Sequence, residues 1–171
     1  MGDYKVLQED YPKIKEFIKS VEDYEKLIID IRGNGGGFDS YWMSIVALLI
    51  DEPLYYRYNV FFKDGHRYNY DPFKVRYLYT VDKLNEEILN QFPEEVRTDY
   101  TFYKTYYERV NPWGVRSNPL DDIDFKGKVY LLVDRGVFSS AENFASFAKD
   151  TGFATLVGET TGGGKGFEWI P

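Results

Sequence analysis

The chain has 171 residues with a formal net charge of −7, which is enough length for one domain with a hydrophobic core. The negative charge argues against a general nucleic-acid binder, because phosphate contacts need clustered Lys and Arg. With no cysteine and one histidine, a thiolate nucleophile, a disulfide framework and a Cys- or multi-His metal site are excluded. No apolar run reaches the roughly 18–20 residues of a membrane-spanning helix. We therefore expect no metal, no cofactor, no nucleic acid and no integral membrane segment.

The first third of the chain predicts a helix, a strand, a glycine loop and a second helix. Helical spacing of apolar residues indicates a surface helix at about 10–22. The short apolar run "KLIIDIRG" at 26–33 is typical of a buried strand that ends in glycine. A helix follows at 40–51, with Asp39 or Ser40 as its N-cap. A strand, a glycine loop and a helix together indicate an α/β unit.

An aromatic-rich stretch at 54–125 separates this unit from the rest of the chain. Residues 54–80 are rich in aromatic and β-branched side chains, and Asp64-Gly65 is a turn signal between two strand-like runs. Residues 81–92 fit a short helix, and the proline-containing segment up to 125 predicts an irregular, lid-like structure. We expect a β-rich insertion within a single domain.

The last third repeats the strand and helix pattern. A second buried strand is predicted at 127–134, a helix at 139–150 and a third strand at 154–159. The glycine loop "TTGGGKG" follows at 160–166. The glycines do not fit phosphate-binding motifs, because Glu159 stands where a P-loop needs its first glycine, and a G-x-G-x-x-G fingerprint starting at residue 33 lacks its third glycine.

Two features could carry acyl-transfer chemistry. The "RGNGGG" loop could present backbone N–H groups to an oxyanion, or its glycines could only make a tight turn. Ser139 and Ser140 lie at a strand-to-helix junction, where a serine is either a nucleophile or a helix cap. A serine nucleophile needs a base. His66 and Lys165 are the candidates, and the alternatives are a solvated hairpin histidine and a flexible surface lysine.

Read together, "LIIDIRGNGGG", "SSAE" and "ATLVGETTGGGKG" resemble the tail-specific, or C-terminal processing, serine peptidases. The resemblance covers roughly residues 10–52 and 126–167. It implies an α/β fold with a Clp protease/crotonase-like core, in which helices flank a mostly parallel sheet. It also implies that Ser139 is the nucleophile, and that N–H groups of Gly36 and Ser140 form the oxyanion hole.

The resemblance leaves the base open. Lysine-dependent members of the family carry the base 25 residues after the nucleophile, but position 164 is glycine here and Lys165 comes one residue later. Lys165 could serve if the glycine loop absorbs that shift, with a pKa lowered from about 10.4 toward ~7–8. Asp150 matches an aspartate that some members carry 11 residues after the serine, and the alternative is an exposed residue at a helix end. Members resembling the tricorn protease core take a histidine from a segment that this sequence does not contain.

The resemblance implies a polypeptide substrate and a place outside the cytoplasm, and it leaves the oligomeric state open. Segments of the family's domain on both sides have no counterpart here, so we expect a fragment or a divergent member. The leading hypothesis is a serine endopeptidase. The second is a catalytically inactive member of the same fold that binds a peptide or an apolar ligand. A crotonase-like thioester enzyme ranks last, because it gives no reason for the Ser139–Glu142 motif.

Overall fold

The computed structural model describes residues 3–63, 78–112 and 123–164. The chain forms two compact units, one comprising Met1–Tyr56 with Arg109–Pro171 and the other Arg57–Glu108. The second unit falls within the predicted insertion 54–125. That residues 1–171 form one catalytic domain stays a prediction.

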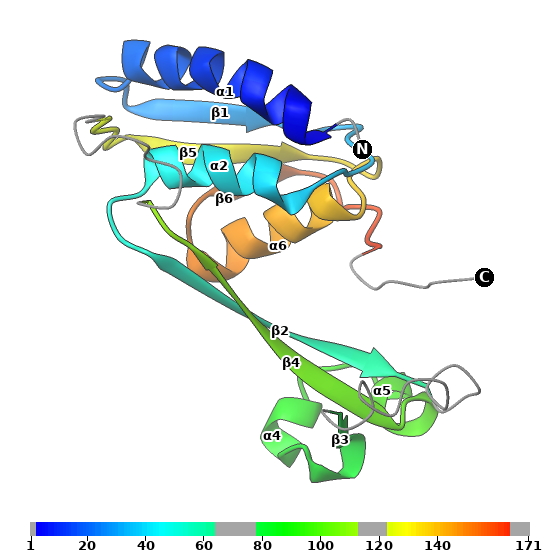
Figure 1. Ribbon diagram of the computed structural model, residues 1–171. Coiled ribbons are helices and arrows are strands. Elements are labelled where there is room, and N and C mark those ends of the chain that lie inside the picture. The colour runs from blue at the N-terminus through cyan, green and yellow to red at the C-terminus, as the bar shows by residue number, and fades with distance from the viewer. Residues whose placement is uncertain (1–2, 64–77, 113–122, 165–171) are drawn as a thin grey trace. The chain divides into compact units, whose positions relative to one another are not determined.

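The first unit is built on a parallel sheet of three strands in the order β1-β5-β6 (Figure 1). The strands are β1 (Lys26–Asp30), β5 (Lys128–Val133) and β6 (Thr155–Gly158). Leu131 at the centre of β5 is paired with Ile29 on one side and Leu156 on the other, and it is fully buried. The predicted parallel α/β sheet is therefore confirmed.

Three helices belong to this unit: α1 (Asp3–Ser20), α2 (Asp39–Leu49) and α6 (Ser140–Thr151). In Figure 1 α2 lies between α1 and α6, and it contacts both. The α2–α6 contact is aromatic, because Trp42 stacks on Phe144 at 5.3 Å between ring centroids and meets Phe147 at 5.0 Å. Burial of such rings is the main apolar contribution to this core.

The start of α2 corrects one prediction. Neither Asp39 nor Ser40 is the N-cap, because Phe38 occupies that position and makes no side-chain cap bond. The Asp39 carboxylate instead accepts hydrogen bonds from Trp42 Nε1 at 3.0 Å and from Asn143 Nδ2 at 3.1 Å. Asp39 thus links the first turn of α2 to α6 rather than satisfying the backbone of its own helix.

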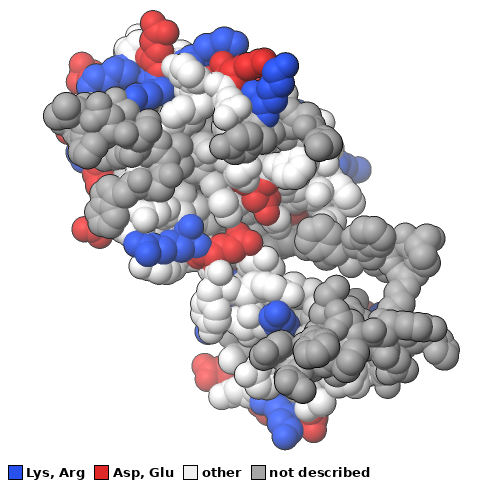
Figure 2. Space-filling model, in the orientation of Figure 1, with Lys and Arg blue, Asp and Glu red and all other residues white. Residues whose placement is uncertain are grey.

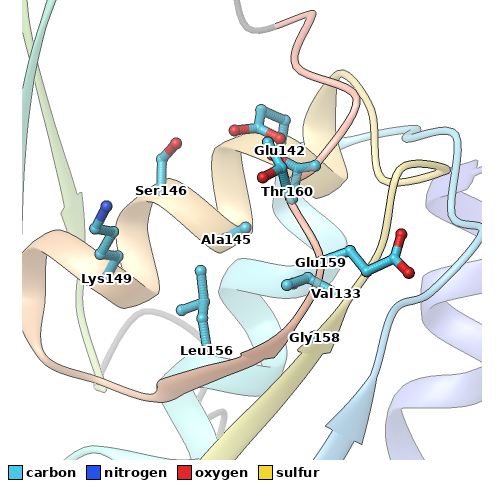
Figure 3. A pocket seen from close by; sticks show the side chains of 10 residues that line it. Val133, Glu142, Ala145, Ser146, Lys149, Leu156, Gly158, Glu159 and Thr160 are labelled. Carbon is cyan, nitrogen blue, oxygen red and sulfur yellow. The ribbon is translucent and has the colours of Figure 1, made fainter.

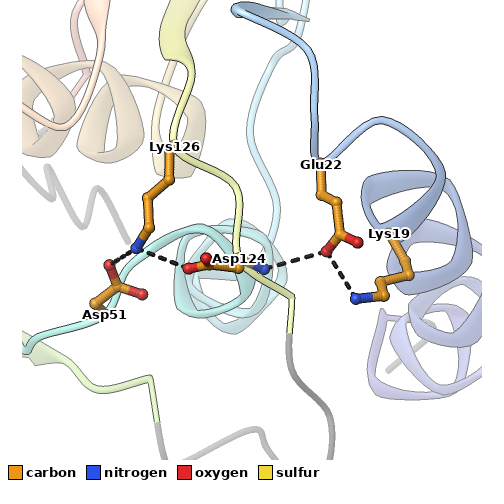
Figure 4. Close-up of polar contacts among 5 residues, drawn as sticks. All are labelled: Lys19, Glu22, Asp51, Asp124 and Lys126. Carbon is orange, nitrogen blue, oxygen red and sulfur yellow. Dashed lines mark hydrogen bonds and ion pairs between the residues drawn. The ribbon is translucent and has the colours of Figure 1, made fainter.

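A chain of ion pairs connects the end of α1 to the approach to β5 (Figure 4). Lys19 Nζ lies 2.7 Å from the Glu22 carboxylate, which also accepts the backbone N–H of Asp124 at 3.3 Å. Lys126 Nζ contacts Asp124 at 2.7 Å and Asp51 at 2.6 Å. These two carboxylates raise the pKa of Lys126, and the Lys19 ammonium lowers the pKa of Glu22. The side chains are largely exposed, so each pair contributes little to stability on its own.

The second sheet has the order β2-β4-β3, and its two long strands run across the boundary between the units. Its strands are β2 (Leu54–Phe62), β3 (Tyr79–Thr80) and β4 (Phe102–Val110). The helical segments η2 (Val81–Lys83), α4 (Glu86–Leu89) and α5 (Glu95–Asp99) lie between β3 and β4. Val81, Leu89 and Val96 form a small core, around which aromatic rings such as Phe61 and Phe92 pack.

The β-rich insertion is confirmed, but the irregular segment predicted after residue 92 is partly wrong. The prolines suggested a loop, whereas Phe102–Val110 is a regular strand whose tyrosines pair with aromatic residues of neighbouring strands. The predicted helix at 81–92 is split into η2 and α4. The predicted turn at Asp64-Gly65 lies outside the described residues.

Figure 2 shows Lys and Arg side chains interspersed with Asp and Glu on the face that is drawn, without a basic field. None of the helices in the described ranges is long and apolar enough to span a bilayer.

Candidate active site

The candidate site lies where the chain leaves the carboxyl ends of β1 and β5. These strands are parallel neighbours, so the loop after β1 and the loop after β5 emerge at the same edge of the sheet. The Phe138 N–H donates to the Asn34 carbonyl at 3.0 Å, and the Gly33 N–H donates to Asp134 Oδ1 at 2.8 Å. The "GNGGG" loop therefore meets the bend at Ser139.

Gly36 lies directly against the predicted nucleophile. A Cβ placed on Gly36 would be 2.7 Å from Ser139 Cβ and 3.0 Å from the Ser140 nitrogen. The φ of Gly36 is +103°, a conformation that favours glycine. Both the close approach and the backbone angle thus explain why the loop has glycine here, and a tight turn alone does not account for it.

Ser139 has the N-cap position of α6, but it does not cap the helix. Its side chain makes no cap hydrogen bond, and its backbone has φ 56° and ψ −121°. Among the described residues it is the only non-glycine with positive φ. Such strain is found where the surrounding structure holds a residue for a function, and it costs on the order of 1–3 kcal/mol. The capping alternative for Ser139 is therefore not supported.

The two predicted oxyanion donors differ in their present hydrogen bonds. Ser140 is the first residue of α6, where backbone N–H groups have no partner within the helix and the dipole is positive. Within the described part of the chain, its N–H has no recorded acceptor. The Gly36 N–H donates to Asn34 Oδ1 at 2.9 Å. Gly36 can therefore bind an oxyanion only after that side chain is displaced.

The glycine loop after β6 also reaches the serine. The Ser139 N–H donates to the Gly163 carbonyl at 3.2 Å, and the Gly162 N–H donates to the Val137 carbonyl at 2.9 Å. A Cβ on Gly164 would lie 2.2 Å from the Phe138 ring, and its φ is +77°. Position 164 therefore has no room for a side chain while Phe138 keeps its place.

Of the remaining predicted residues, the structure describes only Asp150. Lys165 follows the last described residue, and His66 also lies outside the described ranges. Asp150 is exposed in the last turn of α6. Eleven residues of helix span about 16 Å, so Asp150 cannot hydrogen-bond the Ser139 hydroxyl directly.

A pocket of about 340 Å³ lies between α6 and the segment that leaves β6 (Figure 3). Glu142, Ser146 and Lys149 line it from successive turns on one face of α6. One carboxylate oxygen of Glu142 is buried and has no hydrogen-bond partner among the described residues. A peptide group bound in this pocket would therefore contact the polar side chains of α6. The first of them, Glu142, is about one helical turn from Ser139.

Sequence reasoning missed two aspartates in these loops. Asp30 forms two hydrogen bonds with the Arg32 guanidinium, at 2.9 and 2.7 Å, which lower the pKa of Asp30 to about 2. Asp134 accepts the N–H groups of both Gly33 and Gly136. The Asp-x-Gly spacing at 134–136 is a turn signal that could have identified the second, but not its bond to residue 33.

Residues 4–170 match the sequence profile of peptidase family S41. The chain belongs to peptidase family S41. This serine peptidase family includes the C-terminal processing proteases, so the predicted family is confirmed. No curated protein matches the chain. Among the described residues, no three or more His, Asp or Glu side chains gather as a metal site would.

Solved structures show the same fold. One is a putative peptidase from Parabacteroides merdae, with a TM-score of 0.54 and 20% identity over 90% of this chain and 36% of that chain. Mature CPAF complexed with lactacystin has a TM-score of 0.58 and 21% identity, covering 92% of this chain and 34% of CPAF. The predicted Clp protease/crotonase-like α/β core is thus confirmed. The chain spans about a third of the length of these two structures.

Proposed function

We propose that this chain carries the nucleophile and oxyanion hole of a serine endopeptidase. The observation that supports this proposal best is the contact between Gly36 and Ser139, since it sets backbone N–H donors beside a strained serine whose side chain does not cap the helix. Family S41 consists of serine peptidases, which implies a polypeptide substrate. By family resemblance we also propose a place outside the cytoplasm.

In the proposed reaction the Ser139 hydroxyl oxygen attacks a peptide carbonyl carbon and its proton passes to a base. The N–H groups of Ser140 and Gly36 would stabilise the resulting oxyanion, and each such donor is worth about 2.7–4 kcal/mol of barrier. The peptide C–N bond then breaks, and the base returns the proton to the leaving amine. Water hydrolyses the acyl-enzyme by the same route in reverse.

We propose Lys165 as the base. The hydrogen bond between Ser139 and Gly163 supports this, because it fixes the chain two residues before Lys165 next to the nucleophile. The fit of Gly164 against Phe138 gives a reason why position 164 is not a lysine here, since a side chain at 164 would meet the Phe138 ring. A role for Asp150 would be indirect, through the far end of α6.

A fluorophosphonate probe, which reacts with activated serine nucleophiles, tests the proposal. We expect covalent labelling of the parent, none in Ser139→Ala, and a loss of at least about 100-fold in Lys165→Ala. His66→Ala serves as the matched control and should label as the parent does. If the folded protein is not labelled, the endopeptidase is rejected.

The second candidate is an inactive member of the family that binds a peptide. It is favoured by the hydrogen bond that the Gly36 N–H donates to Asn34 Oδ1, because one of the two proposed oxyanion donors is then already engaged. Saturable binding of peptides to both the parent and Ser139→Ala, without probe labelling of either, would support this function.

A further inference from the structure

Asp134 connects the two loops that form the candidate site. It directly follows β5, five residues before Ser139, and its Oδ1 accepts the Gly33 N–H at 2.8 Å and the Gly136 N–H at 2.9 Å. Gly136 belongs to the turn that leads to the serine, and Gly33 opens the glycine loop on the other side. A single carboxylate oxygen thus holds one backbone group from each loop.

The backbones of the two loops also touch at this place. A Cβ on Gly136 would lie 2.7 Å from Gly33 Cα and 3.2 Å from the Gly33 nitrogen. The contacts continue with the Phe138 N–H bonded to Asn34 and end with Gly36 against Ser139. Asp134 lies at the start of this series, where the loops leave the sheet, so its position sets the register of the contacts that follow.

The carboxylate suits this position for two physical reasons. Hydrogen bonds to an ionised acceptor are roughly twice as strong as those between neutral groups. Arg32 lies close enough for the Asp134 charge to help raise the pKa of the guanidinium, after the larger effect of Asp30. The charge of Asp134 is thereby partly balanced, while its Oδ1 remains committed to the two N–H groups.

We propose that Asp134 is a positioning residue, which keeps the loop that carries Gly36 in register with the loop that carries Ser139. The proposal rests on the proposed function for its effect on catalysis. A displacement of about 1 Å between reacting groups can cost about 100-fold in rate. Asp134 touches neither of the predicted oxyanion donors, so its effect passes through the backbone.

Two substitutions separate position from charge. Asp134→Asn keeps an acceptor oxygen at the same distance from the backbone and loses the charge, whereas Asp134→Glu keeps the charge and moves it by one methylene. We expect fluorophosphonate labelling within about 5-fold of the parent for Asp134→Asn, and slower by about 10- to 100-fold for Asp134→Glu and Asp134→Ala. Asp51→Ala removes an exposed, paired carboxylate elsewhere in the same unit and should label normally.

Amide hydrogen exchange at Gly33 and Gly136 tests the two hydrogen bonds to Asp134, which we call the clamp, and it needs no enzymatic activity. We expect both amides to exchange faster in Asp134→Ala and Asp134→Glu than in the parent, and Asp134→Asn to keep most of their protection. Unchanged exchange at both glycines in Asp134→Ala, or a fully reactive Asp134→Glu beside an unreactive Asp134→Asn, would overturn the proposal. A parent that is never labelled rejects the peptidase alone, because the exchange measurement still reports on the clamp.

Discussion

Gly36 lies where the backbone of the glycine loop comes closest to the Ser139 side chain. Its positive φ and the 2.7 Å that a Cβ would leave to Ser139 allow no side chain without a backbone shift. Gly35 in the same loop has nothing within 4 Å of such a Cβ and no positive φ. Of these two neighbouring glycines, only Gly36 is therefore required by its backbone angle and by the space around it.

We predict that Gly36→Ala slows fluorophosphonate labelling at least about 10-fold, because the added methyl group pushes the oxyanion donors away from the serine. Gly35→Ala is the matched control and should label within about 3-fold of the parent, since its methyl group meets no atom. Labelling rates of both variants check this. Equal rates would mean that the contact at Gly36 has no part in the reaction.

For individual residues, the sequence predicted which residues form the candidate site, but not the groups to which they hydrogen-bond. The serine and the glycines were predicted from a motif with a known order of elements. The link from Asp134 to Gly33 spans 101 positions, and no local pattern specifies a hydrogen bond over that separation. Asp39 shows the same limit. Its sequence context predicted an N-cap, whereas its carboxylate accepts hydrogen bonds from Trp42 and Asn143.

Among the elements, α6 links the site to the core of the first unit. Its N-terminus carries Ser139, and its buried face carries Phe147, which has no exposed surface and contacts the rings of Trp42 and Tyr56. The orientation of the serine thus depends on how firmly this helix packs against α2 and the sheet.

We predict that Phe147→Ala lowers the free energy of unfolding by about 3–5 kcal/mol, because it leaves a cavity between α2 and α6. Phe17→Ala is the control, since Phe17 on α1 is 57% exposed and its loss should change stability by less than about 0.5 kcal/mol. Urea denaturation followed by circular dichroism measures both. A change of under 1 kcal/mol for Phe147→Ala would contradict the packing described here.

Elements with a clear period were predicted well, and elements in the aromatic stretch were not. β1, β5 and β6 are short apolar runs bounded by turn residues, which have few alternatives in an α/β chain. In β4 the alternation is obscured, because Tyr103 and Thr105 on one face and Tyr106 on the other are all half-buried, while Tyr107 is exposed. Only pairing with β2 and β3 makes that segment a strand, and pairing is not a local property.

For the whole molecule, the important feature is that each unit has its own core. Leu89 is buried with Val81 and Val96 in Arg57–Glu108, whereas Phe147 and Leu131 belong to the first unit. Small units bury a limited fraction of their surface, so the second unit has little stability to spare.

We predict that Leu89→Ala, which removes about 2–5 kcal/mol of core packing, accelerates amide exchange throughout η2, α4 and α5 while α6 keeps its protection. Leu54→Ala is the control variant, because Leu54 is half-buried at the start of β2. Hydrogen exchange read by mass spectrometry distinguishes the outcomes. Equal loss of protection in α6 would show that the two units unfold together.

The backbone angle of Ser139 has a consequence for how this sequence can change. Glycine would adopt a φ of 56° without a steric penalty, so the hydroxyl is retained at a conformational disadvantage on the order of 1–3 kcal/mol. Without selection for a nucleophile, the substitution Ser139→Gly would raise the thermal stability of the protein. A change to glycine at this bend would therefore relieve the backbone strain and remove the hydroxyl in a single step.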